Sequence, residues 1–385
     1  MDFALTEEQQ MIREAARQFA DSELKPVAAE LDKTGNRQLL LEKLKQLAEL
    51  GFMGINIDPG YGGTGAGTIA FSLAITELAR GCASTATTTS VTNMVAEVIQ
   101  TVGNDEQKSQ YLPKLCSGEY AAGSFCLTEP GSGSDAAAMR TRALKDGDEY
   151  ILNGSKLFIS SAEFAGIFVV WAVTDPEAPK GKGISCFLVE AGTPGLVIGK
   201  AEEKMGQKAS VTNEVAFADC RIPAANLLGE ENKGFRIAAG ELAGGRIGIG
   251  SLALGIGLEA LDCARGYIQE REQFGKKLAQ FQGLQWQLAD KYTEMEAARL
   301  LLMQAAWQKD AGMAFGPVAS MAKLFTSEKA NEACYVALQM HGGVGYTREF
   351  PLERMARDVR ITTIYEGTSE IQRVIIARHL LEGVR

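Results

Sequence analysis

The feature that most limits the possible folds is the spacing of apolar residues, which changes from helical to β-type near residue 121 and back near residue 231. In both outer regions, apolar side chains recur at three- and four-residue intervals, as in amphipathic helices. Between them, short apolar runs such as residues 168–173 and 184–189 are separated by turn residues, which indicates strands. We therefore expect three domains in the 385 residues: N-terminal helices at 1–120, a middle antiparallel β domain at 121–230 and a C-terminal helical region at 231–385.

Local signals place the first and last helices. Thr6 and Gln9 fit a capping box at a helix start, and Pro26 interrupts the apolar pattern that follows. In the last region, long helices are expected over residues 246–270, 284–309, 317–340 and 369–381. The G-x-G-x-x-A pattern at 255–260 lies inside a helical run rather than after a strand, so we interpret it as a site of close helix packing.

Charge and residue counts exclude several kinds of function. The net charge is −9, whereas DNA and anionic membranes are bound through clustered lysines and arginines. Two histidines, His341 and His379, are too few for a histidine-rich metal site. The seven cysteines lack C-x-x-C spacing, so we expect reduced thiols. We predict no nucleic-acid partner, no metal, and proton chemistry carried mainly by carboxylates, lysines or tyrosines.

No apolar run in the sequence is long and uninterrupted enough to cross a bilayer, so we expect no membrane insertion. The acidic N-terminal segment resembles neither a secretory signal nor an arginine-rich transit peptide. We expect a cytoplasmic bacterial protein; a processed protein of the mitochondrial matrix fits the sequence equally well.

Three short segments combine glycine with polar or acidic side chains. In residues 125–135, glycines would let backbone amides approach a ligand, and Thr128 and Ser134 could donate hydrogen bonds, but a strand-to-loop turn explains the composition equally well. Residues 339–346 could approach a phosphate or simply end a helix. Glu366 lies between an apolar flank and a Thr-Ser helix start. Burial there would raise its pKa toward that of a useful base, although such acids more often only complement a helix dipole.

Together these segments resemble the acyl-CoA dehydrogenase family over the whole chain, above all its short-chain and short-branched-chain (butyryl-CoA dehydrogenase-like) members. Residues 126–135 are similar to the first family signature, residues 339–346 with Glu349, Arg354 and Asp358 to the second, and residues 364–369 to the catalytic-glutamate motif. The resemblance implies a multidomain α+β fold with N-terminal helices, a middle antiparallel β domain and a C-terminal four-helix bundle. It also implies one FAD per chain, a homotetramer built as a dimer of dimers, and an electron-transfer flavoprotein as partner.

The resemblance assigns roles to individual residues. Glu366 is implied as the catalytic base, and substrate contacts are implied for Ser134, Arg246, Tyr365 and Gly367. Residues 271–275 and Gln282 would be contributed across the dimer interface. Contacts with FAD are implied for Phe125, Leu127, Thr128, Phe158, Ser160, Arg271, Gln273, Phe274, Gln282, Gln339, Gly343, Thr368 and Glu370. Phe158 and Ser160 replace the tryptophan and threonine that are usual in the family.

The implied reaction is α,β-dehydrogenation of an acyl-CoA to the trans-2-enoyl-CoA, a step of fatty-acid β-oxidation. Glu366 would take the pro-R α-proton while a β-hydride passes to flavin N5. The thioester carbonyl would accept hydrogen bonds from the Glu366 amide and a ribityl hydroxyl. Some members carry the base immediately before the arginine that matches Arg246; Gly245 occupies that position here, which favours Glu366.

Comparison of short segments with subgroups of the family indicates the length of the substrate, and two alternative functions remain to be weighed. Residues 80–85, 245–249 and 281–285 most resemble short-chain members, and residues 84–91 offer no arginine for a distal carboxylate, so we expect a butyryl-CoA-like substrate. One alternative is a flavin-binding homologue without dehydrogenase activity, with a binding or DNA-associated role. The acidic charge and the intact 365–367 motif disfavour it. The other is an acyl-CoA oxidase, whose chains usually carry a further C-terminal domain.

Overall fold

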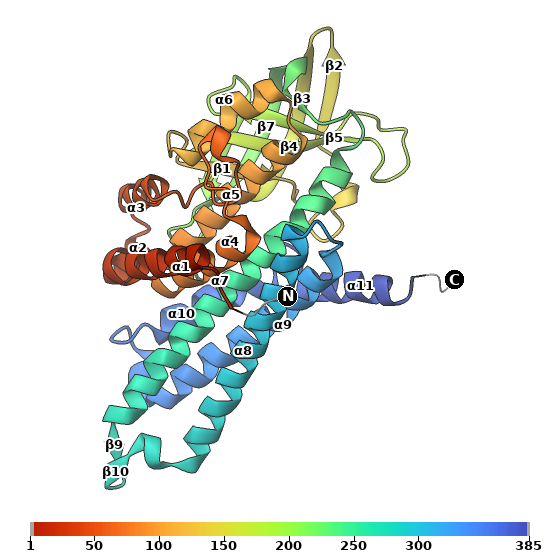
Figure 1. Cartoon of the computed structure of the whole chain (residues 1–385). Helices are drawn as coiled ribbons and strands as arrows, with labels where there is room; N and C mark the ends of the chain where they lie inside the picture. The colour runs from red at the N-terminus through yellow and green to blue at the C-terminus, as the bar shows by residue number, and fades with distance from the viewer. Residues whose placement is uncertain (1–3, 383–385) are drawn as a thin grey trace.

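The computed structural model describes residues 4–382, and Figure 1 shows a β domain at one end of the molecule, from which long helices extend to the other end. The N-terminal helices pack beside the upper part of these long helices. The fold is the one expected from the resemblance: N-terminal helices, a central sheet and C-terminal helices. The first region contains α1 (Glu7–Phe19), α2 (Lys25–Thr34), α3 (Arg37–Glu49), α4 (Gly67–Gly81), α5 (Ala83–Val102) and α6 (Asp105–Cys116).

Capping explains how the first helices begin. As predicted, Thr6 and Gln9 form a reciprocal capping box at α1. Pro26 does not interrupt the helical run: a π-helical turn at Ala20–Leu24 leads directly into α2 and leaves Pro26 in its first turn, where a missing N–H breaks no helical bond. At α4 the cap comes from another region, because the Asp310 carboxylate accepts hydrogen bonds from the Thr68 and Ile69 amides.

The middle region is one eight-stranded sheet in the order β6-β7-β3-β2-β4-β5-β8, with β1 paired to β4. Most pairs are antiparallel, as expected, but β1 and β2 both run parallel to β4, so the sheet is mixed. The strands are β1 (Ala122–Cys126), β2 (Arg142–Asp146), β3 (Glu149–Ser160), β4 (Ala165–Val173), β5 (Ile184–Glu190), β6 (Leu196–Ala201), β7 (Thr212–Pro223) and β8 (Leu227–Leu228).

Strand β4 is buried on both faces, which explains its uninterrupted apolar sequence. Val169 and Trp171 pack in one core with side chains of α5 and α6, whereas Phe168 and Val170 pack in a second core made by the other strands. The sheet is therefore fixed against the N-terminal helices on one side.

The C-terminal region was expected to be a four-helix bundle, and it has three long helices with two short ones. These are α7 (Gly234–Glu270), α8 (Gln282–Asp310), α9 (Gly316–His341), α10 (Leu352–Arg360) and α11 (Ser369–Leu380). A small hairpin of β9 (Glu272–Gln273) and β10 (Lys276–Lys277) joins α7 to α8 at the far tip of the molecule (Figure 1).

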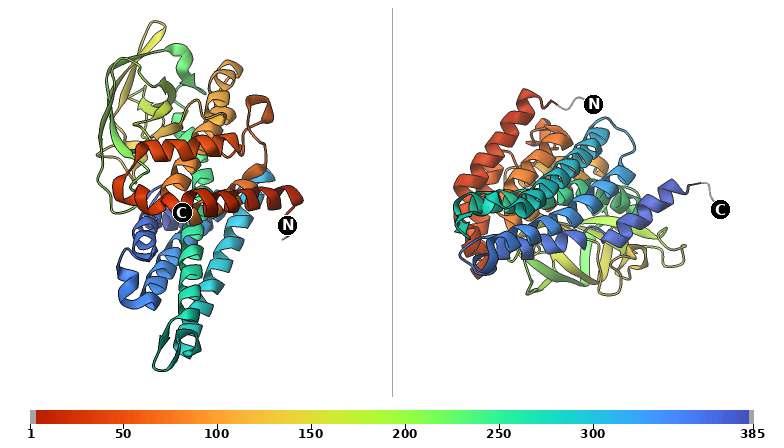
Figure 2. Two further views of the ribbon diagram at one scale, coloured as in Figure 1. Left: turned by 90° about the vertical axis from the view of Figure 1, so that its left-hand side faces the viewer. Right: turned by 90° about the horizontal axis from the view of Figure 1, so that it is seen from below.

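Helix α7 runs from the β domain to this tip (Figure 2), and several of its glycines lie at contacts with other helices. A Cβ at Gly255 would collide with the Thr76 carbonyl oxygen of α4, and one at Gly257 would press on Met295 and Ala330. This confirms the packing interpretation of residues 255–260. Contrary to expectation, α7 has a stretch apolar and long enough to cross a membrane, the one such helix in residues 4–382. Since 83% of that stretch is buried inside the protein, α7 is a core helix.

Candidate active site

Glu366 lies in a strained turn between α10 and α11. The backbone is left-handed at both Glu366 (φ 52°) and Gly367 (φ 94°), and for a glutamate this conformation costs on the order of 1–3 kcal/mol. Two buried side chains hold the turn. Lys323 Nζ donates to the Gly367 carbonyl at 2.8 Å, and Gln372 Nε2 donates to the carbonyls of Gly367 and Glu366 at 2.9 and 3.2 Å. The fold thus fixes the direction in which the Glu366 side chain leaves the backbone.

The Glu366 carboxylate points against α7. The residue as a whole is half-buried, but its Oε2 atom is fully buried and has no hydrogen-bond partner. A Cβ at Gly245 would collide with this oxygen, so no larger side chain fits at position 245 while Glu366 holds this position. Burial raises the pKa of Glu366 to about 7, against the opposing charges of Lys323 and Arg246. Near neutral pH the carboxylate is therefore close to its titration midpoint, as a general base requires.

The two cations that face Glu366 are themselves buried. Arg246 on α7 approaches Ser320 Oγ at 3.4 Å, and its Nε atom has no partner. Burial lowers the pKa of Arg246, and it lowers the pKa of Lys323 to about 8. Neither cation donates a hydrogen bond to the buried Oε2 atom of Glu366. The carboxylate therefore lies in a positive environment without being neutralised by direct contact.

Two strands bring the expected flavin-ring residues together. The Leu157 amide donates to the Thr128 carbonyl at 2.8 Å, and Ser124 Oγ donates to the Ser160 carbonyl at 2.7 Å. These bonds place residues 125–128 beside residues 158–160. Phe158 has a φ of 60° and leaves 60% of its surface exposed. An exposed aromatic face next to backbone and hydroxyl groups fits a flat, polar-edged ring system.

The other expected cofactor residues lie elsewhere. Phe274, with 92% of its surface exposed, is in the hairpin at the tip, and Arg271, Gln273 and Gln282 flank it, at the opposite end of the molecule from the β domain (Figure 1). Gln339 and Gly343 are exposed near this tip, since the His341 ring stacks on Tyr267 of α7 at 4.4 Å. Thr368 caps α11, and Glu370 is exposed in its first turn. One chain alone does not bring the tip residues to the ring residues.

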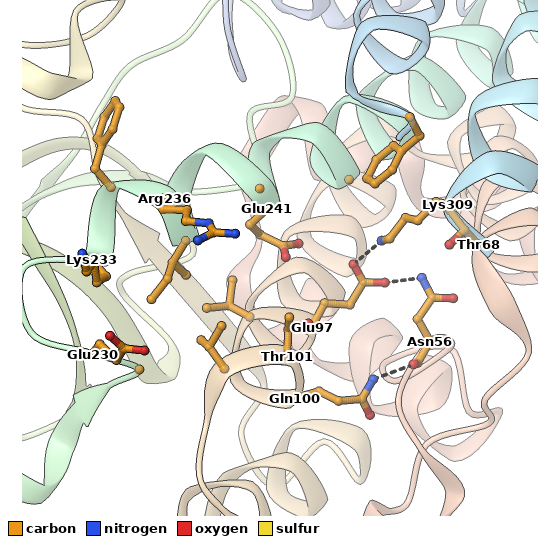
Figure 3. A pocket seen from close by; sticks show the side chains of 18 of the residues that line it. Asn56, Thr68, Glu97, Gln100, Thr101, Glu230, Lys233, Arg236, Glu241 and Lys309 are labelled. Atoms are coloured by element: carbon orange, nitrogen blue, oxygen red, sulfur yellow. Dashed lines mark hydrogen bonds and ion pairs between the residues drawn. The ribbon is translucent and has the colours of Figure 1, made fainter. Parts of the chain in front are cut away.

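A cleft of about 1420 Å³ lies between α5 and α7 (Figure 3). Its β-domain side carries four cations: Lys180, Lys182, Lys233 and Arg236. On α5, Glu97 accepts a hydrogen bond from Lys309 Nζ at 2.6 Å and another from Asn56. Burial and the neighbouring Glu97 raise the pKa of Glu241 well above its usual range. The cleft does not include Glu366, but it reaches Gly244, the residue before the glycine that contacts Glu366.

Comparison with known proteins decides the family. The sequence matches the acyl-CoA dehydrogenase N-terminal domain over residues 6–119, the middle domain over 124–220 and the C-terminal domain over 232–381. The chain belongs to the acyl-CoA dehydrogenase family. The resemblance stated from the sequence is thereby confirmed, and with it the expectation of an enzyme of this class.

Several relatives of this acyl-CoA dehydrogenase match over nearly their full length. The chain is 48% identical to acryloyl-CoA reductase (NADH) of Anaerotignum propionicum (99% of this chain, 96% of the relative). It is 45% identical to a short-chain specific acyl-CoA dehydrogenase of Clostridium acetobutylicum (98% and 99%) and 46% identical to the mitochondrial short-chain enzyme of Rattus norvegicus (99% and 92%). Butyryl-CoA dehydrogenase from Megasphaera elsdenii has the same fold, with a TM-score of 0.95 at 42% identity over 99% of this chain and 100% of the other.

FAD is the cofactor of this acyl-CoA dehydrogenase. A glutaryl-CoA dehydrogenase from Mycobacterium smegmatis, solved in complex with FADH2, aligns with a TM-score of 0.91 at 33% identity, covering 99% of this chain and 96% of the other. The residues present fit the cofactor: Phe158 offers an exposed aromatic face, and a Cβ at Gly343 would meet no neighbouring atom, so its backbone is open to a ligand. Within residues 4–382, no cluster of His, Cys, Asp or Glu could hold a metal ion.

Sequence reasoning missed the residues that support the site of this acyl-CoA dehydrogenase. Lys323 and Gln372 lie outside the family motifs used to predict the site, although both donate hydrogen bonds to the turn that carries Glu366. Gln207 donates to Tyr365 Oη at 3.2 Å and accepts from Thr87, so it fixes the residue before the glutamate. The sequence did contain one indication for Lys323. It lies in α9 on the face formed by small residues that are buried, where a lysine is rarely found without a specific role.

Proposed function

We propose that this acyl-CoA dehydrogenase converts a short-chain acyl-CoA, straight or branched, to the 2-enoyl-CoA, with Glu366 as the base for the α-proton. One observation carries the proposal: the Oε2 atom of Glu366 is buried and has no hydrogen-bond partner, in a strained turn faced by two cations. A carboxylate in this state can accept a proton without first breaking a hydrogen bond. At position 245, where some members of the family carry the base, a Cβ would collide with Glu366 Oε2, so an acid does not fit there beside Glu366.

The chain's residues would act as follows. FAD, when bound, supplies the acceptor for the β-hydride. Glu366 removes the α-proton, and its backbone amide donates a hydrogen bond to the thioester carbonyl, which stabilises the negative charge that develops there. Tyr365 and Gly367, on either side of the base, would contact the acyl group. Arg246 would favour the same charge from the α7 side.

The cleft supports a coenzyme A substrate. The four cations on its β-domain side, Lys180, Lys182, Lys233 and Arg236, would attract the phosphates of the nucleotide. Ser134 lies in an exposed loop that the Lys180–Asp135 ion pair ties to the cleft, which supports a contact between Ser134 and the substrate.

Short acyl chains are favoured because the space near Glu366 is filled from two other helices. A Cβ at Gly245 would meet Met94 as well as Glu366, and one at Gly248 would meet Ser90 and Phe71. The α7 surface next to the base is therefore already covered by side chains of α4 and α5, which leaves little length for an acyl tail.

We also propose a homotetramer with an FAD site completed between subunits. Phe125, Leu127, Thr128, Phe158 and Ser160 would hold the flavin ring of one subunit. The tip residues Arg271, Gln273, Phe274 and Gln282, with Gln339 and Gly343, would reach a cofactor only across an interface. Thr368 and Glu370 would contact FAD at the start of α11. An electron-transfer flavoprotein would accept the electrons, since a structure described as such a protein of Acidaminococcus fermentans includes a chain of this fold (TM-score 0.96, 44% identical over 99% of this chain and 100% of the other).

A second candidate is the reverse reaction, reduction of a short 2-enoyl-CoA. The relative at 48% identity is named acryloyl-CoA reductase (NADH), and the same base would return the α-proton in that direction. The two directions need the same residues in this chain and differ in the electron partner.

The test is anaerobic titration of the purified yellow protein with butyryl-CoA, longer acyl-CoAs and glutaryl-CoA. Butyryl-CoA should bleach the flavin. The Glu366→Gln protein should keep its flavin and reduce it about 10²–10⁴-fold more slowly, because a positioned base contributes about that factor. Normal reduction by Glu366→Gln would refute the assignment of the base. To compare directions, oxidation of butyryl-CoA with the oxidised flavoprotein as electron acceptor is set against reduction of crotonyl-CoA with NADH as reductant and the same flavoprotein as electron carrier.

A further inference from the structure

Lys323 is a buried charge that packing alone does not explain. It lies on the inner stripe of α9 among Ala319, Ala322 and Ala330, and its side chain has no exposed surface. An isolated ammonium ion in such a place is costly unless it is paired or hydrogen-bonded. Lys323 forms no ion pair within the described chain; its one recorded hydrogen bond goes to the Gly367 carbonyl.

That carbonyl belongs to the strained turn that carries Glu366. Gln372 donates to the same carbonyl at 2.9 Å, so a charged and a neutral side chain share one acceptor. The two differ in one further respect: Lys323 also places a positive charge opposite the Glu366 carboxylate. Substitutions of Lys323 and of Gln372 can therefore distinguish the effect of the hydrogen bond to the turn from the effect of the positive charge near Glu366.

We propose that Lys323 is a positioning residue for Glu366: it fixes the left-handed turn through the Gly367 carbonyl, and its charge favours the ionised form of the nearby carboxylate. This inference rests on the proposed role of Glu366 as the base. Gln372 performs the first task and not the second.

The expected pH effect follows from the charges around Glu366. It faces Lys323 on α9, Arg246 and Glu241 on α7, and the neighbouring Tyr365; Lys323 in turn faces Glu328 and Glu370. Burial raises the pKa of Glu366, and Lys323 and Arg246 oppose that rise. Without the Lys323 charge, only Arg246 opposes burial, so ionisation of Glu366 moves to higher pH.

The test compares variants in the flavin-loaded enzyme. Lys323→Met removes donor and charge, Lys323→Gln keeps a donor without charge, and Lys323→Arg keeps the charge. Gln372→Leu removes only a neutral donor. Lys329→Met, six residues further along α9, serves as the control because Lys329 pairs with Glu294 and Glu332 away from the site.

The first readout is the pH dependence of flavin reduction by butyryl-CoA. For Lys323→Met and Lys323→Gln, the rising limb of the rate should move up by about one pH unit, since a neighbouring opposite charge shifts a carboxyl pKa by about 1–3 units. At pH 7 the Met variant should be about 10²-fold slower, because misplacing a catalytic group costs on that order. Gln372→Leu should slow reduction with the limb unmoved, Lys323→Arg should restore the limb, and Lys329→Met should match the wild type.

The second readout needs no turnover. The infrared C=O band of the protonated Glu366 carboxyl, assigned by its loss in Glu366→Gln, is titrated without substrate, and its midpoint should rise in Lys323→Met and Lys323→Gln. An unmoved midpoint in both, or an equal shift in Gln372→Leu, would overturn the inference. If Lys323→Met fails to fold, the Gln and Arg variants still decide. If no acyl-CoA reduces the wild type, the proposed function fails, and the infrared titration still tests Lys323.

Discussion

Two buried Lys–Glu sites in this protein show opposite designs. In the β domain, Lys156 Nζ lies 2.8 Å from Glu129 Oε1, and the Arg140 and Thr141 amides also donate to Glu129. In the helical domain, Lys323 and Glu366 face each other without an ion pair, and Glu366 Oε2 has no partner. Both lysines have no exposed surface. The difference lies in how completely the carboxylate is satisfied.

The consequence appears in the two carboxyl pKa values. Burial alone would raise the pKa of Glu129, but Lys156 and the two amides hold it below its usual range. For Glu366, burial outweighs the two facing cations, Lys323 and Arg246, and raises the pKa to about 7. The fully hydrogen-bonded carboxylate of Glu129 links the loop after β1 to β3 and stays ionised, whereas the unpartnered carboxylate of Glu366 remains able to take a proton. Glu366 can therefore act as a base because its Oε2 atom has no hydrogen-bond partner that would lower its pKa.

The largest effect is expected from breaking the satisfied pair. Lys156→Met leaves Glu129 buried without its cation, and the apparent free energy of unfolding in urea should fall by about 3–5 kcal/mol. The double variant Lys156→Met, Glu129→Gln should recover much of this loss, because no unpaired charge remains. Equal destabilisation in the single and double variants would show that packing, and not charge pairing, makes the contribution.

At the unsatisfied site, around Glu366, we expect removal of the carboxylate to raise the free energy of unfolding. Glu366 binds its proton more tightly when folded, so wild-type stability should fall as pH rises from the unfolded carboxyl pKa of about 4.3 to the folded value of about 7. Glu366→Gln removes this penalty. Its stability relative to wild type should therefore be greater at pH 8 than at pH 5 by on the order of 2–3 kcal/mol. Urea unfolding at both pH values measures this, and a gain independent of pH would contradict it.

A single methyl group should disturb the unsatisfied site through crowding. In Gly245→Ala the new Cβ would collide with Glu366 Oε2, so the carboxylate must move. We expect flavin reduction to slow by about 10²-fold with flavin binding unchanged, since small displacements of a catalytic group have effects of this size. Gly240→Ala is the matched control on the same helix, because its Cβ would meet nothing.

The smallest effect is expected for an exposed pair of the same type. Arg37 and Glu163 lie 3.3 Å apart, and both side chains are exposed to water. Arg37→Gln should change the free energy of unfolding by less than about 1 kcal/mol, and by less still in high salt. A loss comparable to that of Lys156→Met would mean that burial does not separate the two classes of pair.

The order of helical and β regions could be predicted because helices and strands differ in the spacing of their apolar residues. The helices at 284–309 and 317–340 were found within a few residues, and the Thr6 capping box was confirmed. The helix at Pro26 was missed because a π-helical turn accommodates the proline, and the start of α7 was missed because its first turns are rich in glycine and charge. The parallel pairing of β1 with β4 depends on contacts distant in sequence, which local patterns do not contain.

Glu366 could be proposed from the sequence because its motif is local and specific. Lys323 and Gln372 could not, since they come from two other helices and meet the Glu366 turn only in the folded chain, and Arg246 was expected only as a substrate contact. The same holds for Gln207, whose amide joins the β domain to Tyr365. Motifs predict the residues that do the chemistry; the tertiary structure supplies those that hold them.

The collision between a Cβ at position 245 and Glu366 Oε2 means that two backbone segments compete for one volume. An acid grafted onto α7 alone would find that volume taken, and removing Glu366 alone would leave it vacant. Relocating the proton acceptor from the loop to the helix therefore requires a reciprocal exchange, Gly245→Glu together with Glu366→Gly. A variant with only one of the two changes would lose most of the activity, because Glu366→Gly removes the base and Gly245→Glu displaces it, so the exchange requires both substitutions together.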